Sequence, residues 1–308
     1  QIMAGEISPV MTAAILTGLR VKKETIGEIA AAAAVMRELS TKVVVPPPND
    51  HFLDVVGTGG DGSHTFNIST ATIFVAAAAG ARVAKHGGRS VSSKSGSADV
   101  LEALGVNLNL QPEQVAECIS ETGIGFMFAP NHHAAMKNVA PVRREMGVRT
   151  LFNILGPMIN PARPSHLLMG VARPELVELV AETLLQSPLQ RAAVVCGSGN
   201  YDEVTPIGPT KMALLQNGKI TSMMLDPQEF GIPSCSVDDL AVSGKEEAVA
   251  VLNDILDGHG PRAMMDMVVL NVGLAIYLLE EKMDMALCMA RAREAVSGGF
   301  GRKVLHAA

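Results

Sequence analysis

Glycines, hydroxyl residues and cations gather in one segment of the chain, residues 57–99. It contains GTGGDG (Gly57–Gly62), NIST (Asn67–Thr70) and KHGGRSVSSKSGSAD (Lys85–Asp99). A glycine-rich turn lets backbone N–H groups approach an anion closely, and the first turn of a helix adds a positive dipole end. From the last glycine of GTGGDG to Ala98 there is no Asp or Glu, whereas four Arg and Lys residues occur there. We therefore predict a binding site for a ligand that carries several phosphates.

A carboxylate pair, Asp202-Glu203, follows a predicted strand at 191–196 through the turn 197–200. Ligands of open α/β sheets bind beyond the carboxyl ends of the strands. Mg²⁺ typically takes one or two carboxylates and leaves its other positions to water and phosphate oxygens. The pair therefore suits a metal partner for a phosphate ligand, and a hydroxyl of the NIST segment could add an oxygen. The alternative is a solvated surface pair.

The stretch 126–157 holds His132-His133 and then Arg143-Arg144. The guanidinium fork of arginine makes paired hydrogen bonds with a carboxylate, so an acidic ligand is one interpretation and a basic helical surface is the other. Adjacent histidines lack the i,i+4 spacing of a helical metal site, and no cysteine accompanies them. We therefore disfavour zinc.

Gly57, Gly59 and Gly62 also satisfy G-x-G-x-x-G. A dinucleotide site needs a helix that opens at once and an acidic residue about 20 positions later. Here the corresponding stretch, 82–85, has no acid, and we expect the helix to begin near Ser69, with Ser69 or Thr70 as its cap. The pattern therefore disfavours a nicotinamide site. A glycine turn without any ligand is the structural alternative.

The surrounding elements alternate between strands and helices. Ser8-Pro9 predicts a helix to about Arg20, a capping box at Thr25 and Glu28 opens a second helix to about Leu39, and a proline run then forms a linker. Short apolar runs predict strands at Phe52–Val56, Arg82–Lys85, Gly125–Phe128, His166–Gly170 and Arg191–Cys196. Two helices, roughly Ala263–Glu280 and Asp284–Val296, are expected to close the chain. Alternating strands and helices favour an α/β fold with a mostly parallel sheet after a small helical domain.

Composition narrows the class of protein. With 308 residues and 48% hydrophobic content, the chain can bury one large core or two modest ones. A net charge of −6 argues against a nucleic-acid-binding surface, and the apolar runs are too short for a membrane span. Four widely spaced cysteines without a CxxC pair suit reduced thiols in the cytoplasm. The chain begins at Gln1 without Met, so we expect further residues before it.

Taken together, the chain resembles the anthranilate phosphoribosyltransferase family of tryptophan biosynthesis. The motifs GTGGDG, NIST, KHG-RSVSSKSGSAD, FAPNHH, PVRREMGVRT, FNILGP-INP and a late Asp-Glu occur in family order, and the resemblance covers essentially the whole chain. It implies a small helical domain, 1–46 plus about 131–157, hinged to a larger α/β domain with a mostly parallel central sheet, 50–130 plus about 158–308. It also implies a homodimer.

The reaction implied by the resemblance is Mg²⁺-dependent transfer of a phosphoribosyl group from phosphoribosyl pyrophosphate to the amino group of anthranilate. The implied donor-binding residues are Gly57, Gly60, Asp61, Thr65, Asn67, Ile68, Ser69, Thr70, Lys85, His86, Gly87, Gly88, Arg89, Ser90, Val91, Ser92, Ser93 and Ser97. The implied acceptor-binding residues are Gly57, Gly88, Pro130, His133 and Arg143. Two Mg²⁺ ions per subunit are implied, one on Ser69 and Glu203 and one on Asp202 and Glu203. No residue is assigned as a general base.

One position departs from the family pattern. The family has Asn where this chain has Gly88, and that Asn is associated with anthranilate and ribose recognition. Glycine offers no side-chain contact and loosens the loop, so we expect weakened acceptor binding. Two other functions remain alternatives. They are a pyrimidine nucleoside phosphorylase, which would use inorganic phosphate without the Asp-Glu metal pair, and a non-catalytic relative that binds nucleic acid.

Overall fold

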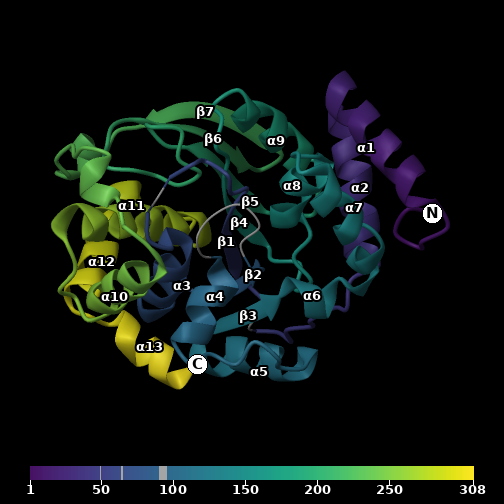
Figure 1. Ribbon diagram of the computed structural model, residues 1–308. Helices are drawn as coiled ribbons and strands as arrows, with labels where there is room; N and C mark the ends of the chain where they lie inside the picture. Colours follow the sequence, from purple (N-terminus) through teal and green to yellow (C-terminus); the bar gives the residue numbers. More distant parts are fainter. Residues whose placement is uncertain (49, 64, 90–95) are drawn as a thin grey trace.

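The central feature of the fold is one twisted sheet, flanked by helices on both faces (Figure 1). The computed structural model describes residues 1–48, 50–63, 65–89 and 96–308. Within these residues the sheet has seven strands in the order β3-β2-β1-β4-β5-β6-β7. The strands are β1 Leu53–Gly57, β2 Val83–Gly87, β3 Ile124–Phe128, β4 His166–Gly170, β5 Arg191–Cys196, β6 Thr210–Gln216 and β7 Lys219–Leu225. The predicted α/β fold class is confirmed.

Strands β1 to β5 pair in parallel, and β6 and β7 pair antiparallel. All five predicted strands occur: two have the predicted bounds, and the ends of the other three differ by up to two residues. The sequence analysis missed the β6–β7 hairpin. Its signal was Asn217-Gly218 between two strand-like runs, because a type I′ turn requires positive φ at both central residues and Asn-Gly adopts it readily. In the structure φ is 53° at Asn217 and 68° at Gly218.

Helices cover both faces of the sheet. They are α1 Pro9–Lys22, α2 Ile26–Glu38, α3 Ile68–Ala78, α4 Ser97–Ala103, α5 Pro112–Thr122, α6 Ala129–His132, α7 Ala140–Met146, α8 Leu151–Leu155, α9 Leu176–Leu184, α10 Lys245–Leu256, α11 Arg262–Leu279, α12 Met285–Ser297 and α13 Gly301–Ala307. Short 3₁₀ helices lie at Ala134–Asn138, Gly156–Met158, Pro227–Phe230 and Asp238–Leu240. Two closing helices were predicted at the end of the chain, and that prediction was incomplete because α13 follows α12.

The buried apolar residues form one layer on each face of the sheet. Helices α3, α10, α11 and α12 supply the larger cluster, together with strand residues such as Val55 and Val195. Helices α2, α8 and α9 pack on the other face against Leu167, Met169 and Val194. The burial of β1 to β5 on both faces explains why their sequences are nearly continuous apolar runs.

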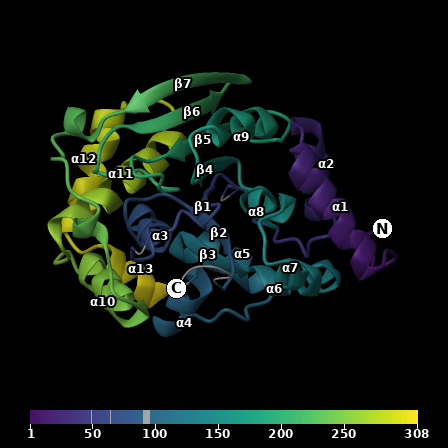
Figure 2. The same cartoon turned by 45° about the horizontal axis from the view of Figure 1, so that its top comes forward.

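Helices α1 and α2 lie on the opposite side of the molecule from α10 and α13 in both views (Figures 1 and 2). Their predicted starts are confirmed: the Ser8 hydroxyl accepts from Met11 N at 3.3 Å, and Thr25 and Glu28 form a capping box. Helix α1 contacts α7 and α8, and α2 contacts α8 and α9. The segment 140–155 therefore packs beside the first two helices.

One helix, α11, is long and apolar enough to cross a membrane by length and composition alone. In this structure it is a core helix, because most of its side chains are buried against the sheet, α3 and α12.

Candidate active site

The candidate site begins where β1 and β4 end. Gly57 and Gly170 are register partners at the carboxyl ends of these two neighbouring parallel strands. A Cβ atom at either glycine would overlap Asp202. The two glycines therefore leave the space into which the loop after β5 places its acidic residues. This is the edge of the sheet where open α/β proteins bind ligands.

Three carboxylates meet at this edge. Oxygens of Asp61, Asp202 and Glu203 lie within 4.8 Å of one another. Burial and the neighbouring Asp61 charge raise the pKa of Asp202 to about 6. Burial and the charges of Asp202 and Asp61 raise the pKa of Glu203 well above its usual value. A cation would neutralise like charges held this close, and carboxylate oxygens are among the ligands that Mg²⁺ prefers. The residues present therefore fit this metal.

The sequence analysis gave Asp61 a place beside the donor and missed it as the third carboxylate of this group. Its position inside GTGGDG was the available signal, because that turn leaves the end of β1 and β1 lies two strands from β5. The edge is therefore less uniformly positive than the acid-free stretch after Gly62 suggested. Carboxylates from distant parts of the chain are brought into it by the sheet.

Lys85 is a buried cation that interacts electrostatically with this acidic group. The side chain is 1% exposed, and its Nζ donates to Val55 O at 2.7 Å and to Ser69 Oγ at 3.2 Å. Burial lowers the pKa of Lys85, while the charges of Asp54, Glu203 and Asp202 raise it. Lys85 therefore ties the first turn of α3, which holds Ser69, to β1 and to the acidic edge.

Asp54 on β1 is another buried carboxylate, and its hydrogen bonds stabilise the strands that lead to this edge. Asn160 Nδ2 donates to Asp54 Oδ2 at 2.8 Å and to Ala84 O at 2.7 Å, and His86 N donates to Asp54 Oδ1 at 3.4 Å. Burial raises the pKa of Asp54 to about 6, against the lowering effect of Lys85. The sequence analysis missed both Asp54 and Asn160. A charged residue inside an apolar strand run was the signal.

The first turn of α3 holds the predicted NIST residues. Its N-cap is Asn67, without a side-chain cap hydrogen bond, so the expected cap at Ser69 or Thr70 was wrong. Ile68 and Thr70 are buried in that turn, and Thr70 Oγ1 donates to Asn67 Oδ1 at 3.4 Å. Just before the helix, Thr65 forms an isolated antiparallel β-bridge with Ala241. Because α3 follows β1 through the glycine turn, its first turn lies at the carboxyl edge, where a helix start can bind an anion.

Two buried histidines lie where β2 meets α6. The rings of His86 and His133 are 5.0 Å apart in an edge-to-face arrangement. Burial and the neighbouring ring lower the pKa of His86 to about 3, and burial and His132 lower that of His133 to about 4, so both rings are neutral. Their Nε2 atoms have no hydrogen-bond partner among the described residues. Each can therefore donate to or accept from a bound ligand.

Arg143 on α7 is a half-buried guanidinium that faces the ring of Phe152 at 5.4 Å. Within the described residues no carboxylate or carbonyl accepts a hydrogen bond from it. A half-buried guanidinium without such a hydrogen bond is suited to bind a carboxylate ligand. Pro130, another predicted acceptor residue, lies exposed in α6 next to Ala129.

The end of β2 carries the remaining predicted residues. A Cβ at Gly87 would lie 3.1 Å from Ser97 Oγ, and one at Gly88 would lie 3.8 Å from the Ala129 Cβ. The guanidinium of Arg89 is bound by Asp99 at 2.9 Å and by both oxygens of Glu102 on α4. Arg89 is thus held by carboxylates here, not left open for a phosphate. Ser90, Val91, Ser92 and Ser93 lie outside the described residues.

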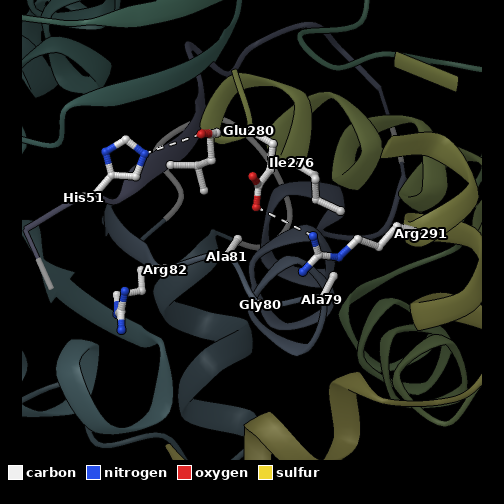
Figure 3. Close-up of a pocket in the computed structure, with 9 residues that line it drawn as sticks. His51, Ala79, Gly80, Ala81, Arg82, Ile276, Glu280 and Arg291 are labelled. Atoms are coloured by element: carbon white, nitrogen blue, oxygen red, sulfur yellow. Dashed lines mark hydrogen bonds and ion pairs between the residues drawn. The ribbon is translucent and has the colours of Figure 1, made fainter. Parts of the chain in front are cut away.

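A separate cavity of about 230 Å³ opens at the opposite, amino-terminal edge of the sheet (Figure 3). His51 Nε2 lies 3.4 Å from Leu279 O, and Arg291 pairs with Glu280 at 3.6 Å. Behind them, Arg191 donates to Tyr277 O at 2.6 Å and to Leu278 O at 3.3 Å. His51 and Arg191 thus lie against the last carbonyls of α11, which a helix end leaves unpaired, whereas Arg291 pairs with a carboxylate. The cavity therefore has a structural explanation.

Comparisons with known proteins agree with this geometry. The profile described as "Glycosyl transferase family, a/b domain" matches residues 49–301, and that described as "Glycosyl transferase family, helical bundle domain" matches residues 1–40. The chain belongs to this family of two-domain glycosyl transferases. Within it, the chain belongs to the anthranilate phosphoribosyltransferases, as its named relatives establish.

The anthranilate phosphoribosyltransferase of Aromatoleum aromaticum is 59% identical over 305 residues, which cover 99% of this chain and 89% of the relative. The structure of the Thermus thermophilus enzyme has a TM-score of 0.92 and 41% identity and covers 99% of this chain and 90% of that one. The Saccharomyces cerevisiae enzyme in complex with phosphoribosyl pyrophosphate (PRPP) and Mg has a TM-score of 0.88 and 28% identity, with coverage of 97% and 84%. Its complex with 4-fluoroanthranilate has a TM-score of 0.86 and 27% identity, with coverage of 97% and 83%.

Proposed function

We propose that this chain transfers the phosphoribosyl group of PRPP to the amino group of anthranilate. The products are N-(5-phosphoribosyl)anthranilate and pyrophosphate. The observation that carries the proposal is the group Asp61, Asp202 and Glu203 beside the glycine turn, at the carboxyl edge of a parallel sheet. Its relatives carry this activity in their names, and one of them was solved with PRPP and Mg.

The donor would lie along the carboxyl edge, against the turn after β1, the first turn of α3 and the end of β2. We assign to it Gly57, Gly60, Asp61, Thr65, Asn67, Ile68, Ser69, Thr70, Lys85, His86, Gly87, Gly88, Arg89, Ser97 and the segment 90–93. Supporting this, the glycine turn and the start of α3 both follow the carboxyl end of β1, and each can offer backbone N–H groups to an anion. Arg89 would have to leave Asp99 and Glu102 to reach a phosphate.

Anthranilate would lie between this edge and the helices near α7. Arg143 would bind its carboxylate, and Gly57, Gly88, Pro130 and His133 would line its place. The half-buried guanidinium, for which no hydrogen-bond acceptor is found among the described residues, supports the first role, because a carboxylate can use its paired donors. The neutral His133 supports the second, because a neutral ring adds no charge that would compete with Arg143.

We assign two Mg²⁺ ions to each subunit, one on Ser69 and Glu203 and one on Asp202 and Glu203. When bound, the metal would neutralise charge on the pyrophosphate that leaves. Lys85, fixed at Ser69 Oγ, keeps that hydroxyl at the edge of the acidic group. The protein's contribution is then positioning: the turn and the α3 terminus hold phosphates, and Arg143 holds the acceptor so that its weak aniline nitrogen faces the ribose.

No side chain is assigned as a general base. The aniline nitrogen becomes acidic once it has attacked the ribose carbon, so it can lose its proton to solvent. Neither His86 nor His133 is suited to be a strong base, because burial lowers the pKa of each. This absence agrees with a reaction whose barrier is lowered mainly by orientation and by stabilising the leaving group.

The domain division predicted from the resemblance remains part of the proposal. We assign 1–46 and about 131–157 to a small helical domain, and 50–130 and about 158–308 to the α/β domain. The packing of α7 and α8 against α1 and α2 supports it. Closure of the two parts would exclude water from the donor. The four cysteines are free thiols, which supports a reducing compartment such as the cytoplasm.

We further propose a homodimer formed through the first two helices. Val10 is 81% exposed, Val21 77% and Leu39 50%, so the outer side of α1 and the end of α2 present apolar groups to solvent. Apolar groups gathered in this way commonly mark a protein interface. Light scattering at micromolar concentration would give the mass of a dimer, and a monomeric mass would contradict the assignment.

The decisive experiment is the decay of anthranilate fluorescence with PRPP, with added Mg²⁺ and with a chelator. We expect decay that requires both PRPP and the metal. Phosphate-dependent cleavage of a pyrimidine nucleoside without such decay would instead indicate the phosphorylase. Binding of nucleic acid without either activity would indicate the non-catalytic relative.

A further inference from the structure

Arg149 lies in the loop between α7 and α8, and its guanidinium is bound to the glycine turn. Its Nη2 donates to Gly59 O at 3.0 Å and also to Gly60 O. A Cβ at Gly60 would overlap this guanidinium, and φ at Gly60 is +69°. The glycine is therefore needed at this position both for its backbone conformation and for the close approach of Arg149.

The contact fixes the direction of two peptide groups. In a trans peptide the C=O and the following N–H point in opposite directions. Because Arg149 binds the carbonyls of Gly59 and Gly60, the N–H groups of Gly60 and Asp61 point away from it. Neither N–H has a partner among the described residues. Two successive N–H groups of this kind form a concave anion-binding surface.

The neighbouring N–H is held differently. Gly59 N donates to Asp202 Oδ2 at 2.6 Å, so the turn is bound by a carboxylate of the acidic group at one point and by Arg149 at two others. These contacts leave the N–H groups of Gly60 and Asp61 as the donors available to a ligand. The turn is thus ordered before any ligand arrives, which lowers the entropy that binding must overcome.

Arg149 is itself fixed from the other side. Its backbone carbonyl accepts a hydrogen bond from Arg20 Nη1 at 2.5 Å, and Arg20 lies near the end of α1. A continuous chain of contacts therefore runs from the first helix through the loop after α7 to the glycine turn. The guanidinium lies across the turn's carbonyls, opposite the two free N–H groups, and so stands on the side away from a bound anion.

We propose that Arg149 is a positioning residue for donor binding: it orients the Gly59–Gly60 and Gly60–Asp61 peptides so that their N–H groups bind a pyrophosphate oxygen of PRPP. This inference rests on the proposed function. It assigns Arg149 no contact with substrate. It also explains how α1, which holds none of the assigned binding residues, acts on the donor site.

The test compares Arg149→Ala and Arg149→Lys with the wild-type enzyme in steady-state kinetics. For Arg149→Ala we expect the KM for PRPP to rise about tenfold, since two oriented hydrogen bonds to a charged group are lost, with kcat and the KM for anthranilate within about twofold. The ammonium of Arg149→Lys keeps the charge and can donate to the carbonyls, but it has a shorter reach and lacks the planar fork, so we expect an intermediate rise of about threefold. Calorimetric titration with PRPP alone should show the same order of affinity.

Two further variants separate positioning from charge and from folding. Lys137→Ala removes an exposed positive charge from the same segment and should leave the KM for PRPP unchanged. Arg20→Ala should raise that KM by a smaller factor than Arg149→Ala. An unchanged KM in Arg149→Ala would overturn the inference, and so would full recovery in Arg149→Lys, which would indicate a direct charge on phosphate. An inactive wild-type chain would instead reject the proposed function itself.

Discussion

The two edges of the central sheet both hold buried charged groups, and they differ in how those charges are compensated. At the carboxyl-terminal edge, Asp61, Asp202 and Glu203 repel one another, and burial and repulsion raise the pKa of the latter two. At the amino-terminal edge, Arg191 is 2% exposed and is bound by two carbonyls at the end of α11. At the first edge a cation would relieve the repulsion, whereas at the second the guanidinium is bound by backbone carbonyls, although its Nε has no partner among the described residues.

We distinguish the binding site from the structural cluster by this difference in charge compensation. The cavity of about 230 Å³ lies at the amino-terminal edge (Figure 3), where His51, Arg191 and Arg291 each have a polar partner. The acidic edge instead holds charges with no sufficient partner among the described residues. Ionisable groups whose pKa is perturbed and whose charge lacks a partner are those expected at functional sites.

Among the changes that test the difference between the two edges, Glu203→Gln is expected to have the largest effect. Loss of this carboxylate should lower kcat/KM by at least about 100-fold, because metal-assisted stabilisation of the leaving group is lost. The metal-free variant should also melt at a higher temperature than the wild type, since the buried repulsion with Asp202 is relieved. Steady-state rates and thermal unfolding would measure the two effects.

Glu229→Gln serves as the control, because Glu229 is an exposed carboxylate outside the site. It should change neither the rate nor the melting temperature appreciably. If Glu203→Gln kept nearly full activity, the acidic edge would be no more functional than the amino-terminal edge.

The matching change at the other edge is Arg191→Met. It leaves the carbonyls of Tyr277 and Leu278 without their partner, and we expect a loss of about 2–4 kcal/mol in the free energy of unfolding. The kinetic constants of the folded enzyme should stay the same. Urea unfolding followed by assays below the transition would measure both quantities.

Arg173→Met is the control, because Arg173 is exposed and pairs only with Glu175 at 3.5 Å. Its effect should stay within about 0.5 kcal/mol. A lower kcat in Arg191→Met without loss of stability would show that the amino-terminal edge takes part in the reaction.

Magnesium should stabilise the chain more at neutral pH than at acidic pH. Because the pKa of Asp202 is about 6 in the folded protein and 3.8 for an unperturbed aspartate, the folded state binds more protons between these values. Stability of the metal-free protein therefore falls as pH rises through this window. The metal binds the deprotonated carboxylates, so its stabilisation, about 2.7 kcal/mol at a concentration of 100 times Kd, should appear above the window and fade below it.

Thermal unfolding at about pH 7.5 and about pH 5, with and without Mg²⁺, would measure this difference. Glu203→Gln should reduce the shift at the higher pH. Equal shifts at both values would indicate that the metal binds elsewhere than the acidic edge.

The sequence alone reached the fold class, the five parallel strands and the glycine, NIST and Asp-Glu motifs, because each of these is local. Strand runs and caps depend on neighbouring residues, and the motifs are contiguous. The role of Arg149 and the partner of Asp54 could not be found in this way, because Gly60 and Asn160 lie 89 and 106 positions away from them. The pairing of Arg89 with Glu102 likewise depends on how α4 turns back toward β2.

Gly88→Asn carries the smallest expected effect, and it tests whether the carboxyl edge is fully adapted to its acceptor. The position has room, since a Cβ there would lie 3.8 Å from the Ala129 Cβ, an ordinary contact. An amide in this place could add one hydrogen bond to the bound substrates, worth about 1 kcal/mol or a fivefold lower KM for anthranilate. Gly88→Ala is the control, because it stiffens the backbone without adding an amide. If both variants changed the KM alike, backbone freedom alone would explain the effect. If neither changed it, glycine would cost the acceptor nothing here, and the carboxyl edge would recognise anthranilate through Arg143 and His133 alone.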